Sequence, residues 1–183
     1  MEQLIYFGVF CLLVLALCIV RPNAGRIFLG IFFLIMATAV NVVLVLVAPE
    51  QFVALGTQGA IVPSYKWSFE HIVIVAPALF GLLTAAYEIA VGLLLLSHGK
   101  YVKWGLIGGI AFLIGITPLG IYTLANPIMA LAMAYLLTKN FEKSLAEIVR
   151  SATRPRPRSA RATTSATITD RTSSEGADPH GWN

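Results

Sequence analysis

Four long runs of apolar residues fill most of the first 138 positions of this 183-residue chain. Only 12% of all residues are charged. A soluble domain of this size cannot bury so many uncharged runs of this length, whereas a bilayer holds each of them as a helix of about 20 residues. The sequence therefore predicts an integral membrane protein of the all-α class.

The runs divide into five predicted transmembrane helices. The first three cover about 4–20, 27–48 and 77–97, with His71 as the alternative start of the third. The last run, 104–138, would be about 52 Å long as one helix, against an apolar bilayer core of about 30 Å. Two short helices fit this run better than one.

Two helix-breaking motifs mark where that last run turns. The segment Thr117-Pro118-Leu119-Gly120 and the pair Asn126-Pro127 each interrupt a helix, so we predict a hairpin between 117 and 127. Asn126 is also predicted to be the N-cap of the fifth helix, with Pro127 in the first helical position. The predicted bundle of five helices occupies 1–138.

The distribution of basic residues predicts the orientation. The first residues, Met1-Glu2-Gln3, carry no Lys or Arg, so the first helix is predicted to be retained rather than cleaved as a signal peptide, with its N-terminus outside. Five crossings then leave only Lys66 of the 13 basic residues outside, as the positive-inside rule requires. We expect a bacterial inner membrane with a cytoplasmic C-terminal tail.

Two segments outside the predicted helices carry further signals. The segment 49–70 is the one sizeable outer loop, and its end, 65–70, alternates aromatic and polar residues. Aromatic anchors at the headgroup level are the favoured interpretation; a short strand and an aromatic lid over a pocket are the alternatives. On the inner side, 139–150 is predicted to continue the last span as a basic amphipathic helix.

The tail from Ser151 to Asn183 is rich in Arg, Ser, Thr, Pro and Ala, and is predicted to be disordered. Its basic run, 154–158, is predicted to be plain solvated chain, with anionic lipid headgroups, nucleic acid or soluble proteins as alternative partners. The hydroxyl residues in 163–174 offer phosphorylation sites.

Glu88 is the residue with the clearest chemical interest. It lies near the middle of the third predicted helix, where a carboxyl group costs a few kcal/mol and must find a partner in protein or water. No Lys or Arg lies in a predicted apolar core, so we expect Glu88 to be neutral at pH 7 and to donate a hydrogen bond. A structural role in fixing helix register and a role in binding a ligand or handling a proton both remain open. The candidate partners are Thr38, Asn41, Tyr87, Thr117, Tyr122, Asn126 and Tyr135.

Small residues surround Glu88 and predict close helix packing. Gly81, Ala85 and Gly92 share its helix face at spacings of three and four, and Gly105 and Gly109 form a similar pair on the next helix. Small faces of this kind allow helices to approach closely. We therefore expect helices three and four to cross near Glu88, and such faces also suit a protein partner or a second copy.

Several kinds of chemistry have no support in the sequence. The two cysteines, Cys11 and Cys18, lie on one face of the first helix, too far apart to pair, and are interpreted as small buried apolar residues. His71 and His98 lie at opposite ends of the third helix, which disfavours a bis-histidine haem. No metal site, phosphate loop or nucleophile–base pair is visible. We expect no catalytic residue of its own and no metal.

The stretch Tyr87-Glu88-Ile89-Ala90-Val91-Gly92, continuing as Leu-Leu-Leu-Leu-Ser-His-Gly-Lys to position 100, resembles the DoxX-like family of small bacterial membrane proteins. The resemblance covers about 27–137. It implies a four-helix bundle, here preceded by one extra helix. Some members of that family are subunits of quinone-linked sulfur oxidoreductases, and others belong to thiol-redox or oxidative-stress complexes. Of the possible site residues, only Glu88 and Gly92 match the family's pattern.

Three functions follow as hypotheses. The favoured one is an accessory or scaffold subunit of a membrane complex, whose partner does the chemistry. The alternative is a quinone- or lipid-binding component of a membrane oxidoreductase, with Glu88, Asn41, Tyr87, Tyr122 and Asn126 as ligand-binding or proton-handling residues and a quinone as cofactor. A small transporter is the third, because broken helices beside an intramembrane acid are found in transporter sites.

Overall fold

A computed structural model describes residues 2–153 of the chain. All regular secondary structure in this range is helical, which confirms the all-α prediction. The predicted disorder of 154–183, the basic run 154–158 and the phosphorylation sites in 163–174 lie outside the described residues.

The chain begins with two long helices joined by a single residue. Helix α1 ends at Val20 and α2 begins at Pro22, where proline suits the first helical turn because its missing N–H has no partner there. The second helix continues without a break through a π-helical segment and a short α-helical end. Its parts are α2 (Pro22–Ile35), η1 (Met36–Val42) and α3 (Val43–Val47), after α1 (Glu2–Val20).

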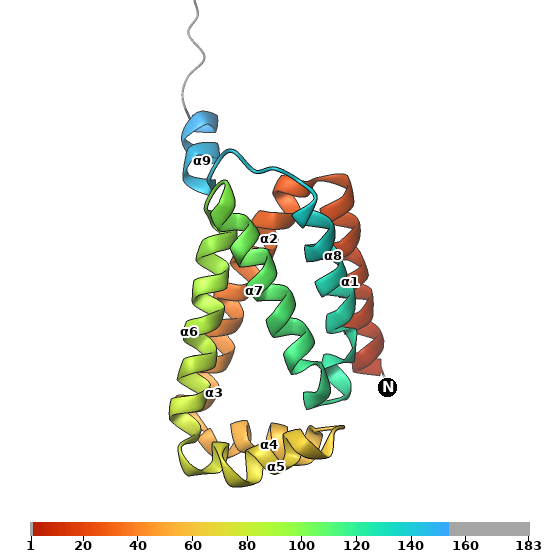
Figure 1. Ribbon diagram of the computed structural model, residues 1–183, viewed down its shortest axis with the longest axis vertical. Helices are drawn as coiled ribbons and strands as arrows, with labels where there is room; N and C mark the ends of the chain where they lie inside the picture. Colours follow the sequence, from red (N-terminus) through yellow and green to blue (C-terminus); the bar gives the residue numbers. More distant parts are fainter. Residues whose placement is uncertain (1, 154–183) are drawn as a thin grey trace, which may run out of the picture. The chain divides into compact units, whose positions relative to one another are not determined.

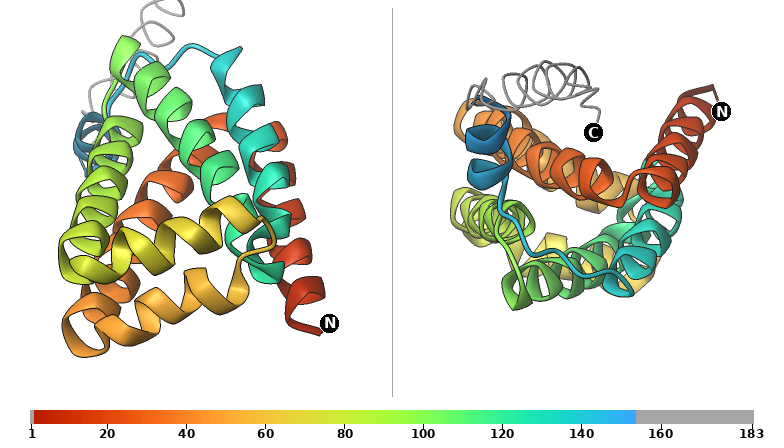
Figure 2. Two further views of the ribbon diagram at one scale, coloured as in Figure 1. Left: turned by 60° about the horizontal axis from the view of Figure 1, so that its bottom comes forward. Right: turned by 90° about the horizontal axis from the view of Figure 1, so that it is seen from above.

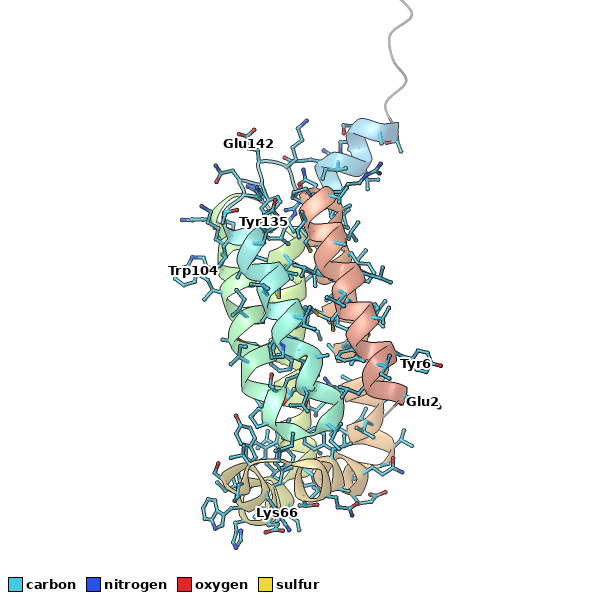
Figure 3. All side chains as sticks on the ribbon, turned by 90° about the vertical axis from the view of Figure 1, so that its right-hand side faces the viewer. Glu2, Tyr6, Lys66, Trp104, Tyr135 and Glu142 are labelled. Atoms are coloured by element: carbon cyan, nitrogen blue, oxygen red, sulfur yellow. The ribbon has the colours of Figure 1, made fainter. Side chains whose placement is uncertain are left out.

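Three helices in the described range are long and apolar enough to cross a membrane: Pro22–Val47, Pro77–Leu96 and Lys100–Leu119. Two shorter apolar helices, Leu4–Val20 and Thr123–Leu137, lie beside them. Many large apolar side chains on these helices are exposed, as a lipid-facing surface requires. Tyr6 and Trp104, for example, point away from the helices (Figure 3) and are 72% and 63% exposed.

Five helices form a closed ring in which each packs against two neighbours (Figures 1 and 2). The order around the ring is α1, α2, α6, α7 and α8, which closes again on α1. Their buried side chains form one continuous apolar core, which includes both cysteines at 0% exposure. The ring members not yet given are α6 (Pro77–Leu96), α7 (Lys100–Ile116) and α8 (Asn126–Leu137).

The segment 49–70, predicted as an outer loop, is folded into two helices, α4 (Pro49–Gly59) and α5 (Pro63–His71), which lie across one end of the ring (Figure 2). The Ile61 N–H donates to the Pro118 carbonyl at 2.9 Å, and the Tyr65 hydroxyl donates to the Gly115 carbonyl at 2.7 Å. The alternative of a strand over 65–70 is wrong, because proline at the first turn starts a helix there and an isolated strand would have no partner for its backbone groups. Lys66, on α5, marks this end in Figure 3.

The predicted break in the last apolar run is confirmed. Helix α7 ends at Ile116, and two 3₁₀ segments, Thr117–Leu119 and Ile121–Ala125, lead to α8 at Asn126. The N-cap role of Asn126 is wrong. Ala125 holds the N-cap position without a side-chain hydrogen bond, and Asn126 is already helical, with its side chain buried.

The predicted continuation of the last span over 139–150 also differs from the structure. Helix α8 ends at Leu137, a non-helical strap crosses 138–144, and a new helix, α9, covers Leu145–Thr153. A reciprocal pair of hydrogen bonds starts α9: the Ser144 N–H donates to Glu147 Oε2 at 2.8 Å, and the Glu147 N–H donates to Ser144 Oγ at 3.3 Å. The Ser144 N–H and, at 3.1 Å, the Ser144 hydroxyl both donate to Glu147 Oε2, and these two bonds lower the pKa of the exposed Glu147 carboxyl.

Arg26 fixes the strap and is fully buried. Its guanidinium donates to the carbonyl of Ser97 at 2.5 Å and to that of Lys143 at 2.9 Å, and it lies 4.9 Å from the centre of the Phe141 ring. Ser97 ends α6, so the cation also meets the negative end of that helix. The expectation that no arginine would lie in the core is therefore wrong for Arg26, whose partners come from backbone carbonyls far along the chain.

Candidate ligand-binding cavity

Glu88 lies in the middle of α6 and is only 4% exposed. The Nδ2 amide of Asn41 donates a hydrogen bond to Glu88 Oε2, across the contact between the second helix and α6. This confirms Asn41 as a partner of the acid, but the predicted direction is wrong, because Glu88 accepts this hydrogen bond and was expected to donate one. The pair joins two helices that are 47 residues apart in sequence.

Asn41 lies on the π-helical segment, Met36–Val42. A π-helical turn holds one more residue than an α-helical turn, so it shifts the faces of the residues that follow it. Such segments are rare and are often found at functional sites. Here the segment occurs in the one stretch of the second helix that bonds the buried acid.

A cavity of about 380 Å³ opens beside Glu88 within the ring. All five ring helices contribute to its wall, together with η1 and the 3₁₀ segment before α8. Four phenylalanines dominate the lining, and the polar groups are few. The residues that line it are Phe7, Phe32, Phe33, Met36, Glu88, Phe112, Leu113, Ile116, Thr123 and Asn126. We call this space the Glu88 cavity.

The polar side chains that line the Glu88 cavity differ in how many of their hydrogen-bonding positions are occupied. The Thr123 hydroxyl is bound to backbone carbonyls, at 2.8 Å to both Thr117 and Gly120. Asn126 is 3% exposed, and its Nδ2 has no hydrogen-bond partner within the described part of the chain. Glu88 accepts from Asn41 at one oxygen. The cavity is thus an apolar space with two incompletely used polar side chains, Glu88 and Asn126.

The structure separates the other predicted site residues from this pair. The Tyr87 hydroxyl donates to the Gly108 carbonyl at 3.1 Å, and the ring stacks on Phe112 from outside the cavity lining. Thr38 and Thr117 each donate to a carbonyl one turn earlier on their own helices. Tyr135 lies under the Lys139 ammonium, 4.6 Å from its ring centre. The side chain of Tyr122 lies outside the described residues.

The small residues lie at helix contacts, but not at the predicted crossing. A Cβ on Gly81 would strike Val45, and one on Gly92 would lie 2.9 Å from the Gly30 carbonyl oxygen. This face of α6, on which Ala85 is also buried, therefore packs against the second helix rather than α7. Gly105 meets α6 at Leu94 and Leu95, near the turn between the two helices, and Gly109 meets Met133 of α8.

Sequence reasoning missed the aromatic wall. The four phenylalanines come from three different helices, at positions where phenylalanine is equally typical of a lipid-facing surface. The neighbouring pair Phe32–Phe33 gave no signal of its own, because adjacent residues lie only about 100° apart on a helix and can share either a lipid-facing or a buried side. Their rings are nearly perpendicular, at 84°.

No cluster of three metal-binding side chains occurs among residues 2–153. Comparison with protein-family models, curated proteins and solved structures gave no match to the chain. The resemblance to the DoxX-like family therefore stays a prediction. The function is argued below from the Glu88 cavity.

Proposed function

We propose that this protein binds an apolar small molecule inside its helix ring, and that Glu88 holds the polar end of that ligand. The observation that carries the proposal is a buried carboxyl group opening onto an apolar, aromatic-walled cavity of about 380 Å³. Binding sites for small molecules have this composition: an apolar lining with a few polar groups that fix orientation. A purely structural acid would be expected to have well-packed side chains around it instead.

The bilayer supplies the ligand in this proposal. Beyond the three long apolar helices, we propose that α1 and the Thr123–Leu137 helix also cross, giving five spans with the N-terminus outside and the C-terminal tail in the cytoplasm of a bacterial cell. The charge distribution supports this orientation. The Glu88 cavity would then lie at mid-membrane depth, where lipids and quinones dissolve.

The protein would act as a binding component of a membrane complex rather than as a complete enzyme. Quinones and other lipids with one polar end are the ligand types that the family resemblance implies. A partner would supply any redox chemistry, and the basic tail would contact that partner or a second copy, because the small helix faces are used in contacts within the ring. The two leading sequence hypotheses, accessory subunit and ligand-binding component, are compatible in this form.

Native mass spectrometry of the protein extracted gently from its own membrane tests the proposal. The wild-type protein should carry a small molecule of defined mass. The variant Glu88→Gln, which keeps the size of the side chain, should lose most of it, and so should Ile116→Trp, which fills the cavity from the opposite wall.

Glu50→Gln is the matched control, because Glu50 is an exposed acid on α4. It should retain the ligand as the wild type does. A wild-type protein with no bound molecule other than exchangeable bulk lipid, or equal retention in all four proteins, would contradict the proposal.

A further inference from the structure

We infer that the ligand of the Glu88 cavity is a lipophilic organic cation, which places its positive charge on the Glu88 carboxylate and its apolar groups against the phenylalanines. This rests on the proposed function and names the class of molecule that the same site binds. Amines, quaternary ammonium ions and phosphonium ions with aromatic or alkyl groups belong to this class.

The charges around the cavity favour a cation as the ligand. Glu88 is the one titratable group among the ten residues that line the cavity. The helices packed against α6 carry Arg26 on α2, Glu50 on α4, and Lys100 and Lys103 at the start of α7. None of these lines the cavity, and the Arg26 guanidinium is already bound to the carbonyls of Ser97 and Lys143. The carboxylate therefore has room for a positive charge that these neighbours do not provide.

The hydrogen bond from Asn41 to Glu88 favours a cation as well. An amide N–H donated to a carboxyl oxygen stabilises the negative carboxylate more than the neutral acid. It uses only part of the acceptor capacity, because a carboxylate has two oxygens with about four lone-pair sites. This bond reaches Oε2, and no hydrogen bond to Oε1 is formed within residues 2–153, so Oε1 remains for a ligand.

The aromatic wall of the cavity also favours a cation. The face of an aromatic ring attracts a cation within about 6 Å, and the attraction is strongest where water is excluded. Phe33 and Phe112 meet at 62° with their centres 6.0 Å apart, and Phe32 and Phe33 meet at 84°. All three rings line the cavity together with Glu88. An acid among aromatic rings binds a cation more selectively than it binds a neutral ligand.

Charge balance gives the site a pH dependence. A proton held on Glu88 in the empty cavity has to leave before the carboxylate can pair with a cation. When the cation replaces that proton, the net charge of the cavity does not change. Protons and the cation therefore compete for one carboxylate, so affinity should fall by up to about tenfold for each pH unit on the acid side of the Glu88 titration.

The test uses the full chain in an uncharged detergent, with protein-free micelles as blank. Equilibrium dialysis measures binding of tetraphenylphosphonium and of tetraphenylborate, two ions of the same shape and opposite charge. We expect saturable binding of the phosphonium and none of the borate, with affinity rising as the pH rises. Glu88→Gln should weaken phosphonium binding at least tenfold, and Phe112→Leu should weaken it several-fold, while Glu50→Gln should leave it unchanged.

A short-chain benzoquinone, which is neutral, separates this inference from the proposed function. Saturable binding of the quinone with no binding of the phosphonium would overturn the inference that the ligand is a cation. The proposed ligand-binding function would still hold. Failure of both probes, together with no bound molecule in native mass spectrometry, would overturn the proposed function itself. Equal binding of the phosphonium by Glu88→Gln would also overturn the inference.

Discussion

Arg26 and Glu88 are both buried and ionisable, yet their surroundings differ. Arg26 is held by two backbone carbonyls and a ring, from the end of α6 and from the strap 138–144. Glu88 has one side-chain partner and faces a cavity. A buried charge surrounded by fixed backbone groups holds a structure together, whereas a buried charge beside empty space has capacity left for a ligand.

The largest expected effect on stability comes from replacing Arg26. Arg26→Leu should lower the free energy of unfolding by about 3 kcal/mol, because it leaves two carbonyls without their charged donor and frees the strap from α2. Thermal melting in detergent measures this. Arg21→Leu, an exposed arginine five residues earlier, is the control and should change stability little. Equal melting temperatures for the two variants would contradict a structural role for Arg26.

The contact between α2, which carries Arg26, and α6, which carries Glu88, should show the second-largest effect on stability. Gly92→Ala should destabilise the protein by about 2 kcal/mol, because the new Cβ would lie 2.9 Å from the Gly30 carbonyl oxygen and 2.9 Å from the Leu34 Cγ. Gly115→Ala is the matched control, since a Cβ there meets nothing within 4 Å. If both variants melted alike, the close approach of α2 and α6 would be in doubt.

The hydrogen bond between Glu88 and Asn41 should contribute less. A double-mutant cycle with Glu88→Leu and Asn41→Leu should give a coupling energy of about 1 kcal/mol, within the range measured for interhelical hydrogen bonds in membranes. Thr38→Val with Glu88→Leu should be additive, because Thr38 bonds its own helix. If Glu88→Gln alone unfolded the protein, Glu88 would have a structural role like that of Arg26, and the contrast between the two residues would be wrong.

The smallest effect concerns the start of α9. The lowered pKa of Glu147 means that its carboxylate stabilises the first turn of α9 above the ordinary carboxyl range, and that this stabilisation disappears as the pH falls through the lowered pKa. The NMR shift of the Ser144 amide proton should follow that titration. In Glu147→Gln the shift should not depend on acid pH; an unchanged titration there would exclude this hydrogen bond as its cause.

The sequence predicted the parts of this account that depend on composition and on helix-breaking residues. The apolar runs and the break between Ile116 and Asn126 follow from residue types and their positions. A buried acid needs a polar partner, but the sequence left seven candidates for Glu88, and only the structure selects Asn41 among them.

The remaining features depend on which helix faces meet, and the sequence leaves that choice open. Arg26 comes just before the second predicted helix, 27–48, and nothing near it in the sequence indicates burial; the strap that covers it returns from more than 110 residues later. The small face of α6 was assigned to α7, its neighbour in sequence, whereas it packs against the second helix. The aromatic wall requires the whole ring to be closed before its four phenylalanines come together.

A high-resolution experimental structure of the protein, purified with lipids from its own membrane, tests the central claim most directly. We predict non-protein density in the Glu88 cavity, in contact with Oε1 of Glu88 and with the phenylalanine rings, while Arg26 keeps its bonds to the carbonyls of Ser97 and Lys143. A cavity closed by its own side chains, with Glu88 fully bonded to protein groups, would show that the two buried charges have the same structural role and would contradict the account.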